Sequence, residues 1–475
     1  MPPVRKIKNL RNNIKRISLL GLLTLLNSCS TLTGPPIDRA LLSSPGVFPV
    51  KNAAINLCEA SVSDQLPRVV PPMAKPAYLQ PTIDPAFGNR LVRISQSSQG
   101  TIHKPLYSTV QAWNADESLL LLFRRRPNGD GDYLLLDGHT YEAKGRVPVR
   151  PADIEEVFWS RNDPDRLFYV SSNFARENQF LSYNVATRQH GFIKDFRPMC
   201  RSGSIARAGN DVHMQSHDDD LFGFRCEAPG GGFNLMSYRI STDELNVVKA
   251  GEGNTWDNWR APVPAPSGTS MWLHKDIIDP QFQAISRRLD MANSGEHGDV
   301  GLTHTGEDSI FQTVFDPSPA GCNGAPDKGV GHLGAHSFNK DECRGMITEA
   351  EGWPYTTSGT HVSAGAIRQP GWIALSSIGY REQLPFHSNQ QPATPLFSEI
   401  YLMNTNPNTP QVCRIAHHRS FGKFATKGGY NGYFAEPHPS HSPSGTRVIF
   451  GSDWQDSGSV DAYVVELPGY IPPAR

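Results

Sequence analysis

The sequence lacks the features that mark several common classes of protein. Lysine and arginine (45) balance aspartate and glutamate (46), so the formal charge of the 475 residues is only −1. Nucleic-acid-binding domains normally carry a strong basic excess, and the chain has no basic stripe, so that class is excluded. The Gly-x-Ser-x-Gly motif of serine hydrolases is missing, and the glycines at 230–232 lack the Lys-Ser/Thr of a phosphate-binding loop.

Long hydrophobic runs and sustained helical periodicity are also missing. The one clear apolar run, residues 17–26, is too short to cross a hydrocarbon layer of roughly 30 Å as a helix. Glycine (42) and proline (39) are abundant, which is typical of frequent turns between short strands. The length allows either two or three average domains or one large all-β domain.

The amino terminus has the pattern of an export signal. Six basic residues and no acidic one precede the apolar run, which ends in Leu26-Asn27-Ser28-Cys29. This ending resembles the bacterial lipobox, which implies that Cys29 is lipidated and attaches the protein to a membrane; an ordinary secretory signal is the alternative. Ser30 after the cysteine implies the outer membrane. Removal of residues 1–28 would lower the formal charge from −1 to −7.

Six further cysteines in an exported chain predict disulfides, although six cysteines allow 15 pairings. The pairs closest in sequence are Cys200–Cys226 and Cys322–Cys343, and Cys58–Cys413 is then left. A competing hypothesis is a tetrahedral zinc site made by Cys322, His332, His336 and Cys343.

After the Pro- and Ser-rich residues 29–80, the chain repeats one sequence motif, in which a polar turn leads into an apolar strand. The turns fall near residues 117, 165, 219, 268, 306, 371 and 445, an average step of about 55 residues. Units of this size with several short strands each predict a seven-bladed β-propeller over residues 81–470. A pair of β-sandwiches is the alternative.

The sequences of these motifs resemble those of known propellers. Residues 442–453, Ser-Pro-Ser-Gly-Thr-Arg-Val-Ile-Phe-Gly-Ser-Asp, resemble a phrase of TolB-type periplasmic propellers. Four further segments resemble segments of secreted bacterial propellers related to oligogalacturonate lyase: residues 111–116, 159–164, 416–419 and 436–438. That resemblance implies a metal-assisted lyase acting on uronate-containing glycans. The chain departs from the lyase motif Gln-x-x-His-Pro-His, because Tyr433 replaces the glutamine, Glu436 replaces the first histidine, and only the final histidine is kept, as His438.

Functional residues of a propeller usually gather at one mouth of its channel, where the innermost strand of each blade begins. Counting back about 7–10 residues from each turn reaches Tyr107, Glu155/Glu156, Asp211/His213, Asn258/Arg260, His297, His361 and Glu436/His438. Imidazoles and a carboxylate suit a divalent metal, for which we consider Mn, Zn or Ca. The predicted ligands are His297, His361, His418, Glu436 and His438, and the predicted catalytic residues are Arg260 and Tyr433.

Two functions therefore remain open from the sequence. The first is a lipid-anchored enzyme of the cell envelope that cleaves acidic polysaccharide by β-elimination. The second is a non-catalytic lipoprotein whose propeller binds an envelope protein or a glycan. The net charge of −7 slightly disfavours the enzyme, because polyanionic substrates prefer positive grooves.

Overall fold

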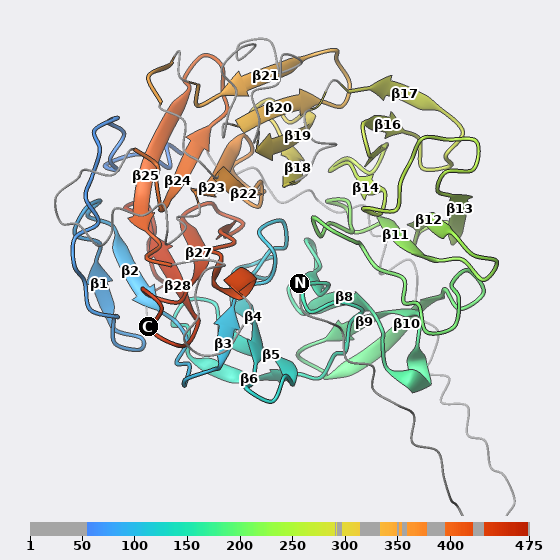
Figure 1. The fold of residues 1–475 in the computed structure, drawn as a ribbon, viewed down its shortest axis with the longest axis horizontal. Helices are drawn as coiled ribbons and strands as arrows, with labels where there is room; N and C mark the ends of the chain where they lie inside the picture. Colours follow the sequence, from blue (N-terminus) through green and yellow to red (C-terminus); the bar gives the residue numbers. More distant parts are fainter. Residues whose placement is uncertain are drawn as a thin grey trace, which may run out of the picture. The chain divides into compact units, whose positions relative to one another are not determined.

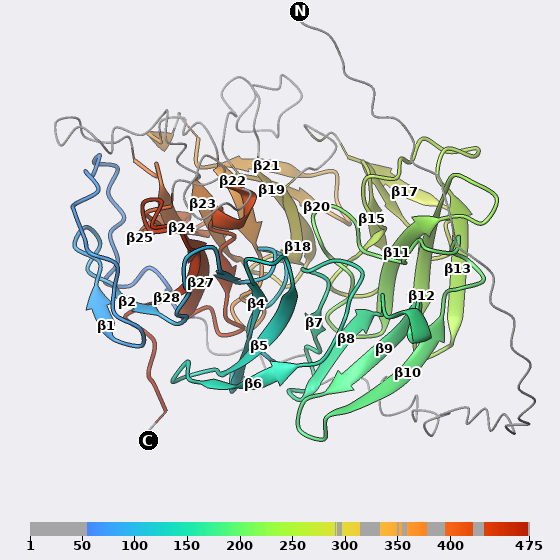
Figure 2. The ribbon, with the colours of Figure 1, turned by 60° about the horizontal axis from the view of Figure 1, so that its bottom comes forward.

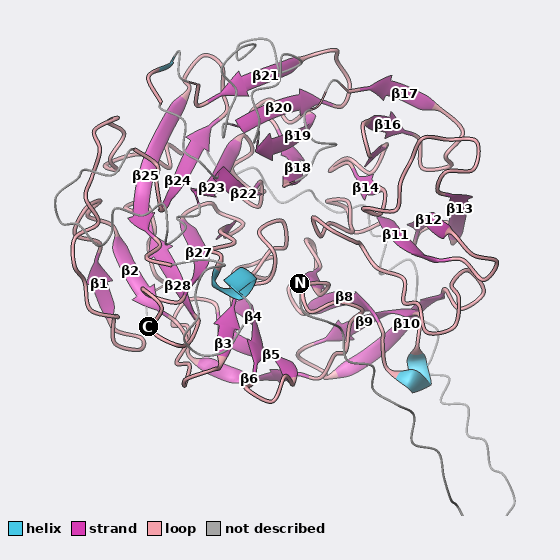
Figure 3. Ribbon diagram, viewed as in Figure 1, coloured by secondary structure: helices cyan, strands magenta, loops and turns pink. Residues whose placement is uncertain are grey.

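A computed structural model gives the fold of the chain. It describes residues 55–289, 291, 297–313, 333–348, 351–353, 359–377, 395–420 and 432–473. Regular structure in these residues is almost entirely β-strand (Figure 3), with short 3-10 turns at η1 (Phe174–Arg176) and η7 (Gly432–Ala435). They contain no helix that is long and apolar enough to cross a membrane.

The strands form seven antiparallel sheets that follow one another around a ring (Figure 1). Blade 1 is β3 (Ile102–Lys104), β4 (Leu119–Arg125), β5 (Gly131–Asp137) and β6 (Ala143–Val147), and blade 2 is β7 (Phe158–Trp159), β8 (Arg166–Val170), β9 (Gln179–Asn184) and β10 (Gln189–Asp195). Blade 3 is β11 (Leu221–Glu227), β12 (Phe233–Arg239) and β13 (Glu244–Lys249), and blade 4 is β14 (Val263–Pro264), β15 (Met271–Leu273), β16 (Asp276–Ile278) and β17 (Ile285–Arg288). Blade 5 is β18 (Gly298–Leu302), β19 (Asp308–Thr313), β20 (Leu333–Ser337) and β21 (Cys343–Met346), and blade 6 is β22 (Gly359–Ser363), β23 (Trp372–Ser377), β24 (Glu399–Asn404) and β25 (Gln411–His417). Blade 7 is β26 (Ser440–His441), β27 (Arg447–Ser452) and β28 (Asp461–Glu466), joined by β2 (Arg90–Arg93) and β1 (Pro81–Ile83).

The predicted seven-bladed propeller is confirmed. In six blades the predicted turn lies just before the second strand, as residue 445 lies before β27 and residue 268 before β15, and in blade 3 residue 219 lies just before β11. Blade 3 differs from the others at its inner edge. Its innermost segment pairs with β11 through isolated bridges, Arg207 with Arg225 and Gln215 with Phe222, and forms no continuous strand.

Blade 7 closes the ring by combining strands from the two ends of the described chain (Figure 2). β28 pairs with β2 from Arg90↔Glu466 to Arg93↔Tyr463, and β2 pairs in turn with β1. Every residue of β27 and β28 is buried, because neighbouring blades cover both faces of this sheet. This explains why both strands are apolar without the alternation of a half-exposed strand.

The segment before β1 packs along blades 6 and 7. Val62 forms a bridge with Arg414, whose guanidinium donates to the Leu66 carbonyl at 2.6 Å. The same guanidinium makes a two-pronged ion pair with Glu399 at 2.8 and 2.7 Å. A disulfide between Cys58 and Cys413 fastens this segment to β25.

The predicted pairings Cys58–Cys413 and Cys200–Cys226 are therefore both present. Cys343 is also disulfide-bonded, whereas Cys322 and His332 lie outside the described residues. The zinc hypothesis for this region is wrong, because a cysteine in a disulfide has no thiolate with which to bind a metal.

Candidate metal centre

One mouth of the channel gathers a connected set of polar side chains from all seven blades. In most blades the member lies in the segment just before the innermost strand, whereas Tyr107 follows β3 in blade 1 and His361 lies within β22 in blade 6. Tyr107 joins blade 1 to blades 3, 6 and 7, because its hydroxyl donates to Asp211 at 2.8 Å and its ring contacts His361 and His438. Counting back from the turns therefore found side chains that meet in space.

Three of these side chains could hold a metal ion. His361, Glu436 and His438 are buried, and one ligand atom from each lies within 4.8 Å of the others. The two imidazole rings are 4.1 Å apart between centroids, and His361 Nε2 is 3.8 Å from a carboxylate oxygen of Glu436. Neither nitrogen of His361 has a hydrogen-bond partner, and the same holds for Nε2 of His438, among the described residues. Unpartnered buried imidazole nitrogens beside a carboxylate fit a divalent cation.

Local backbone structure sets the orientation of His438. The residue follows η7 and Pro437, and its φ of 42° places it in the left-handed region. Its Nδ1 lies 2.9 Å from the Glu436 carbonyl, to which it donates, so Nε2 keeps a lone pair for a ligand. His297, with φ of 55°, has the same unusual conformation. Such residues cluster at functional sites, where the surrounding fold must hold them.

Both clustered histidines are neutral at physiological pH. Burial lowers the pKa of His361 well below its ordinary 6.5, and the nearby His297 and Lys104 lower it further. Burial also lowers the pKa of His438, with additional effects from Lys104 and His361. Metal binding requires the neutral imidazole, so neither histidine must first lose a proton.

His297 and Arg260 lie beside this cluster. The His297 ring is 5.1 Å from the His361 ring, and the His297 backbone NH donates to Asp211 at 2.8 Å. Arg260 is buried, and its guanidinium donates a 2.7 Å hydrogen bond to the Asp211 carboxylate. Asp211 thus connects the segments before blades 4 and 5 to the tyrosine of blade 1.

Tyr433 takes part in a second polar group at the same mouth. Its hydroxyl donates to Glu155 at 2.9 Å, and its ring packs on His438 at 4.9 Å. Lys104, fully buried, pairs with Glu155 at 2.6 Å and lies 5.2 Å from the Tyr433 ring centroid. Burial, and then Glu155, raises the pKa of Tyr433 well above 10, so the phenol keeps its proton.

His418 was a predicted ligand, but the structure places it elsewhere. Its Nε2 donates to the Ser377 carbonyl at 2.8 Å, and its Nδ1 accepts from the Ser420 NH at 2.9 Å. Both imidazole nitrogens therefore form hydrogen bonds to the backbone. His418 directly follows β25, the outermost strand of blade 6, where these bonds stabilise the chain. The prediction of His418 as a metal ligand is therefore wrong.

Lys104 is the member of the set that sequence reasoning missed. It lies three residues before Tyr107 at the end of β3, outside the interval counted back from the turn. The long connection between β3 and β4 makes that interval too short in blade 1. A lysine in an innermost strand was the available signal, since this side chain is rarely buried without a carboxylate partner.

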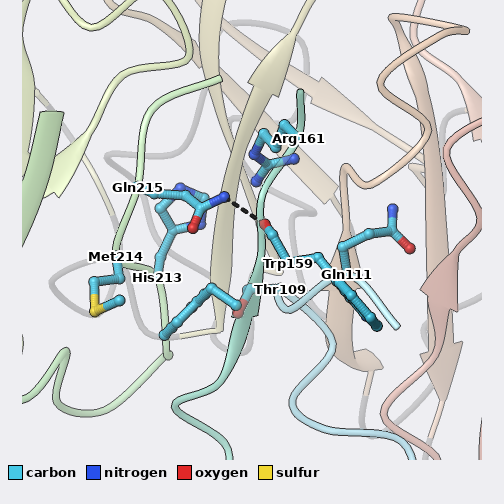
Figure 4. A pocket seen from close by; sticks show the side chains of 8 residues that line it. Thr109, Gln111, Trp159, Arg161, His213, Met214 and Gln215 are labelled. Carbon is cyan, nitrogen blue, oxygen red and sulfur yellow. Dashed lines mark hydrogen bonds between the residues drawn. The ribbon is translucent and has the colours of Figure 1, made fainter. Parts of the chain in front are cut away.

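A small cavity lies farther along the innermost strands (Figure 4). Thr109, Gln111, Arg161, His213 and Gln215 line it, and it accommodates one water-sized group. Gln215 donates to the Trp159 carbonyl at 2.8 Å, and His213 lies 3.3 Å from Asp299. These polar contacts hold the innermost strands of blades 2, 3 and 5 together.

Glu156, at the same mouth, is mostly protonated at neutral pH. Its side chain accepts hydrogen bonds from the NH groups of Ala208 and Gly209 at 3.0 and 3.3 Å, and it is 2% exposed. Burial raises its pKa to about 8, against 4.5 ordinarily, with Arg207 opposing the shift.

We expect this carboxyl to make stability depend on pH. Because the folded chain binds the proton more tightly than the unfolded chain, stability is greatest below pH 4.5 as far as this group is concerned, and it falls as the pH rises through 8. The slope should reach about 1.4 kcal/mol per pH unit. Urea unfolding of Glu156→Gln should lack this component, whereas the exposed Glu252→Gln should match the wild type. An unchanged profile in Glu156→Gln would contradict the assignment.

The comparisons with known proteins agree with the fold. No protein-family model matches the chain, and no curated protein does. A solved oligogalacturonate lyase in complex with manganese is 16% identical with a TM-score of 0.57, covering 82% of this chain and 96% of its own. Oligogalacturonate lyase from Vibrio parahaemolyticus is 14% identical, with the same TM-score and coverage. TolB from Acinetobacter baumannii is 10% identical with a TM-score of 0.32, covering 78% of this chain and 63% of its own. The chain is thus similar in fold to the oligogalacturonate lyase propellers.

Proposed function

We propose that the protein is a metal-dependent lyase of the cell envelope that cleaves uronate-containing glycans by β-elimination, attached to the membrane through a lipid on Cys29. The observation that carries the proposal is the cluster of His361, Glu436 and His438, with its unpartnered imidazole nitrogens at the mouth of the channel. Likeness to the two lyase structures supports it through the fold.

The donor set favours Mn²⁺ or Zn²⁺ over Ca²⁺, since two of the three groups are imidazoles and calcium prefers oxygen. Such an ion, when bound, supplies positive charge that binds a uronate carboxylate and acidifies the adjacent C–H. His361, Glu436 and His438 would hold it.

The remaining residues handle the proton and the charge. His297 lies beside the cluster and takes the proton from the carbon next to the carboxylate, while the C–O bond to the leaving sugar breaks and a C=C bond forms. The departing sugar oxygen takes up a proton from solvent, and the imidazole returns its own proton to solvent after release of the products. Arg260, oriented by Asp211, offsets negative charge that develops on the carboxylate. Tyr433 keeps its proton through the bond to Glu155, so its role is to donate a hydrogen bond rather than to act as a base.

Elemental analysis of the export-processed protein, purified without chelator, tests the proposal. We expect about one Mn or Zn per chain, and an ultraviolet-absorbing unsaturated product from polygalacturonate that disappears after chelation and returns with metal. Absence of stoichiometric metal would contradict the lyase. Bound metal with glycan binding but no unsaturated product from any uronate polymer would favour the non-catalytic scaffold.

A further inference from the structure

Asp211 accepts hydrogen bonds from three groups that belong to different blades. Its Oδ1 accepts from the Tyr107 hydroxyl of blade 1 at 2.8 Å. Its Oδ2 accepts from the Arg260 guanidinium at 2.7 Å and from the His297 backbone NH at 2.8 Å. The residue is 7% exposed, so water competes little for these bonds. One carboxylate therefore fixes the relative positions of three residues at the mouth that carries the metal centre.

The bond to His297 holds a backbone conformation that is otherwise unfavourable. His297 has φ of 55°, in the left-handed region, which costs free energy for a residue with a Cβ. Its NH is bound by Asp211, and its carbonyl accepts from the NH of Thr313, at the end of β19, at 3.3 Å. The peptide groups on both sides of His297 are thus fixed, and so is the direction in which its imidazole leaves the backbone.

That direction brings the imidazole to the metal centre. The His297 ring lies 5.1 Å from the His361 ring, and His297 is only partly buried, whereas the three candidate ligands are buried. The same carboxylate also holds Tyr107, whose ring contacts the rings of His361 and His438 at 5.4 and 5.3 Å. Asp211 therefore sets the place of His297 relative to the ligands.

We propose that Asp211 is a positioning residue of this site, which holds the His297 imidazole at the reacting carbon without itself touching the substrate. This inference rests on the proposed function, in which His297 is the base. Arg260 depends less on Asp211, because its guanidinium also lies 4.2 Å from the Trp272 ring. Loss of the carboxylate should therefore impair proton removal more than substrate binding.

The variant Asp211→Gly tests the proposal, because glycine tolerates the φ of 47° at this position and only the side chain is lost. On polygalacturonate its kcat should fall about 100-fold, as a misplacement of about 1 Å can cause, with little change in KM. Metal stoichiometry should stay at that of the wild type, since no ligand is changed. Hydrogen exchange followed by mass spectrometry should show about 10-fold faster exchange at the His297 amide, which has lost its acceptor.

The variant Asp211→Asn should recover most of the kcat and the slow exchange, because its amide oxygen can still accept from Arg260 and His297. Merely structural loss is measured by Asp219→Gly. Asp219 is also buried, has φ of 60°, and accepts from the Ser160 hydroxyl at 2.6 Å and the Arg161 NH at 3.0 Å. These bonds lie at the turn that follows β7, whereas the residues of the mouth precede β7.

Both glycine variants should lower the free energy of unfolding, but only Asp211→Gly should change kcat and the exchange at His297. An unchanged kcat in Asp211→Gly, an equal loss of kcat in Asp219→Gly, or no recovery in Asp211→Asn would overturn the positioning role and leave the lyase standing. A wild-type chain that forms no unsaturated product from any uronate polymer would instead overturn both proposals.

Discussion

Replacement of His361 by alanine is expected to raise the dissociation constant for Mn²⁺ or Zn²⁺ by at least about 100-fold. Loss of a residue that only hydrogen-bonds to a metal ligand can already weaken metal binding by up to about 100-fold, and loss of the ligand itself should weaken it more. His361 supplies one of three potential ligands. Because all three residues are buried, water cannot readily take the place of the lost imidazole. His438→Ala should have the same effect. Lyase activity should fall with metal content in both variants.

A matched control exists in His418→Ala. This imidazole is as buried as His361, but hydrogen bonds to the backbone around Ser377 and Ser420 account for both its nitrogens. Its removal should lower the free energy of unfolding by about 1–3 kcal/mol by leaving buried backbone groups unpaired, while metal stoichiometry stays at that of the wild type. Metal titration monitored by elemental analysis and urea unfolding give the two readouts.

The pattern of the two readouts decides the assignment. Loss of metal in His418→Ala, or retention of metal in His361→Ala and His438→Ala, would show that the ion lies elsewhere or that the histidines only hold the blades together. Loss of metal confined to His361→Ala and His438→Ala, in chains that remain folded, supports the centre described above.

The blade pattern could be predicted because each turn is a local event. Ser442-Pro443-Ser444-Gly445 specifies a tight turn by its own chemistry, since Gly445 has φ of 76° and its NH donates to the Ser442 carbonyl. Seven such turns, one in each blade, then fix the number of blades. The closure of blade 7 by β1 and β2 was not predicted, because it pairs residues more than 350 positions apart and no local signal specifies the partner.

The metal centre was predicted in part for a related reason. His361 and His438 lie about 10 and 7 residues before a turn, so the repeat itself places them near the channel. His418 is close to both in the sequence, but strand order decides where it goes, and the outermost strand of a blade ends far from the axis. Contacts such as Glu155 with Lys104 and Tyr433 depend on the ring being closed, which no single blade reveals.

Removal of the Cys58–Cys413 disulfide is expected to cost more stability than removal of Cys200–Cys226. The first bond joins residues 355 positions apart and the second only 26. In the loop-entropy account a disulfide stabilises by restricting the unfolded chain, and the restriction grows with the length of the loop, giving about 6 against about 3.5 kcal/mol. Urea unfolding of the double variants Cys58→Ser/Cys413→Ser and Cys200→Ser/Cys226→Ser would measure both without leaving free thiols.

The longer bond also joins two parts of the fold that must stay together. Residues 55–80 lead into β1 and β2, and these strands complete blade 7 without any covalent closure of the ring. With the disulfide gone, Arg414 still holds this segment through Glu399 and the Leu66 carbonyl, so the variant should remain folded but open more readily at blade 7. Amide exchange should therefore accelerate first in β2 and β28, and uniform acceleration around the ring would contradict this account of closure.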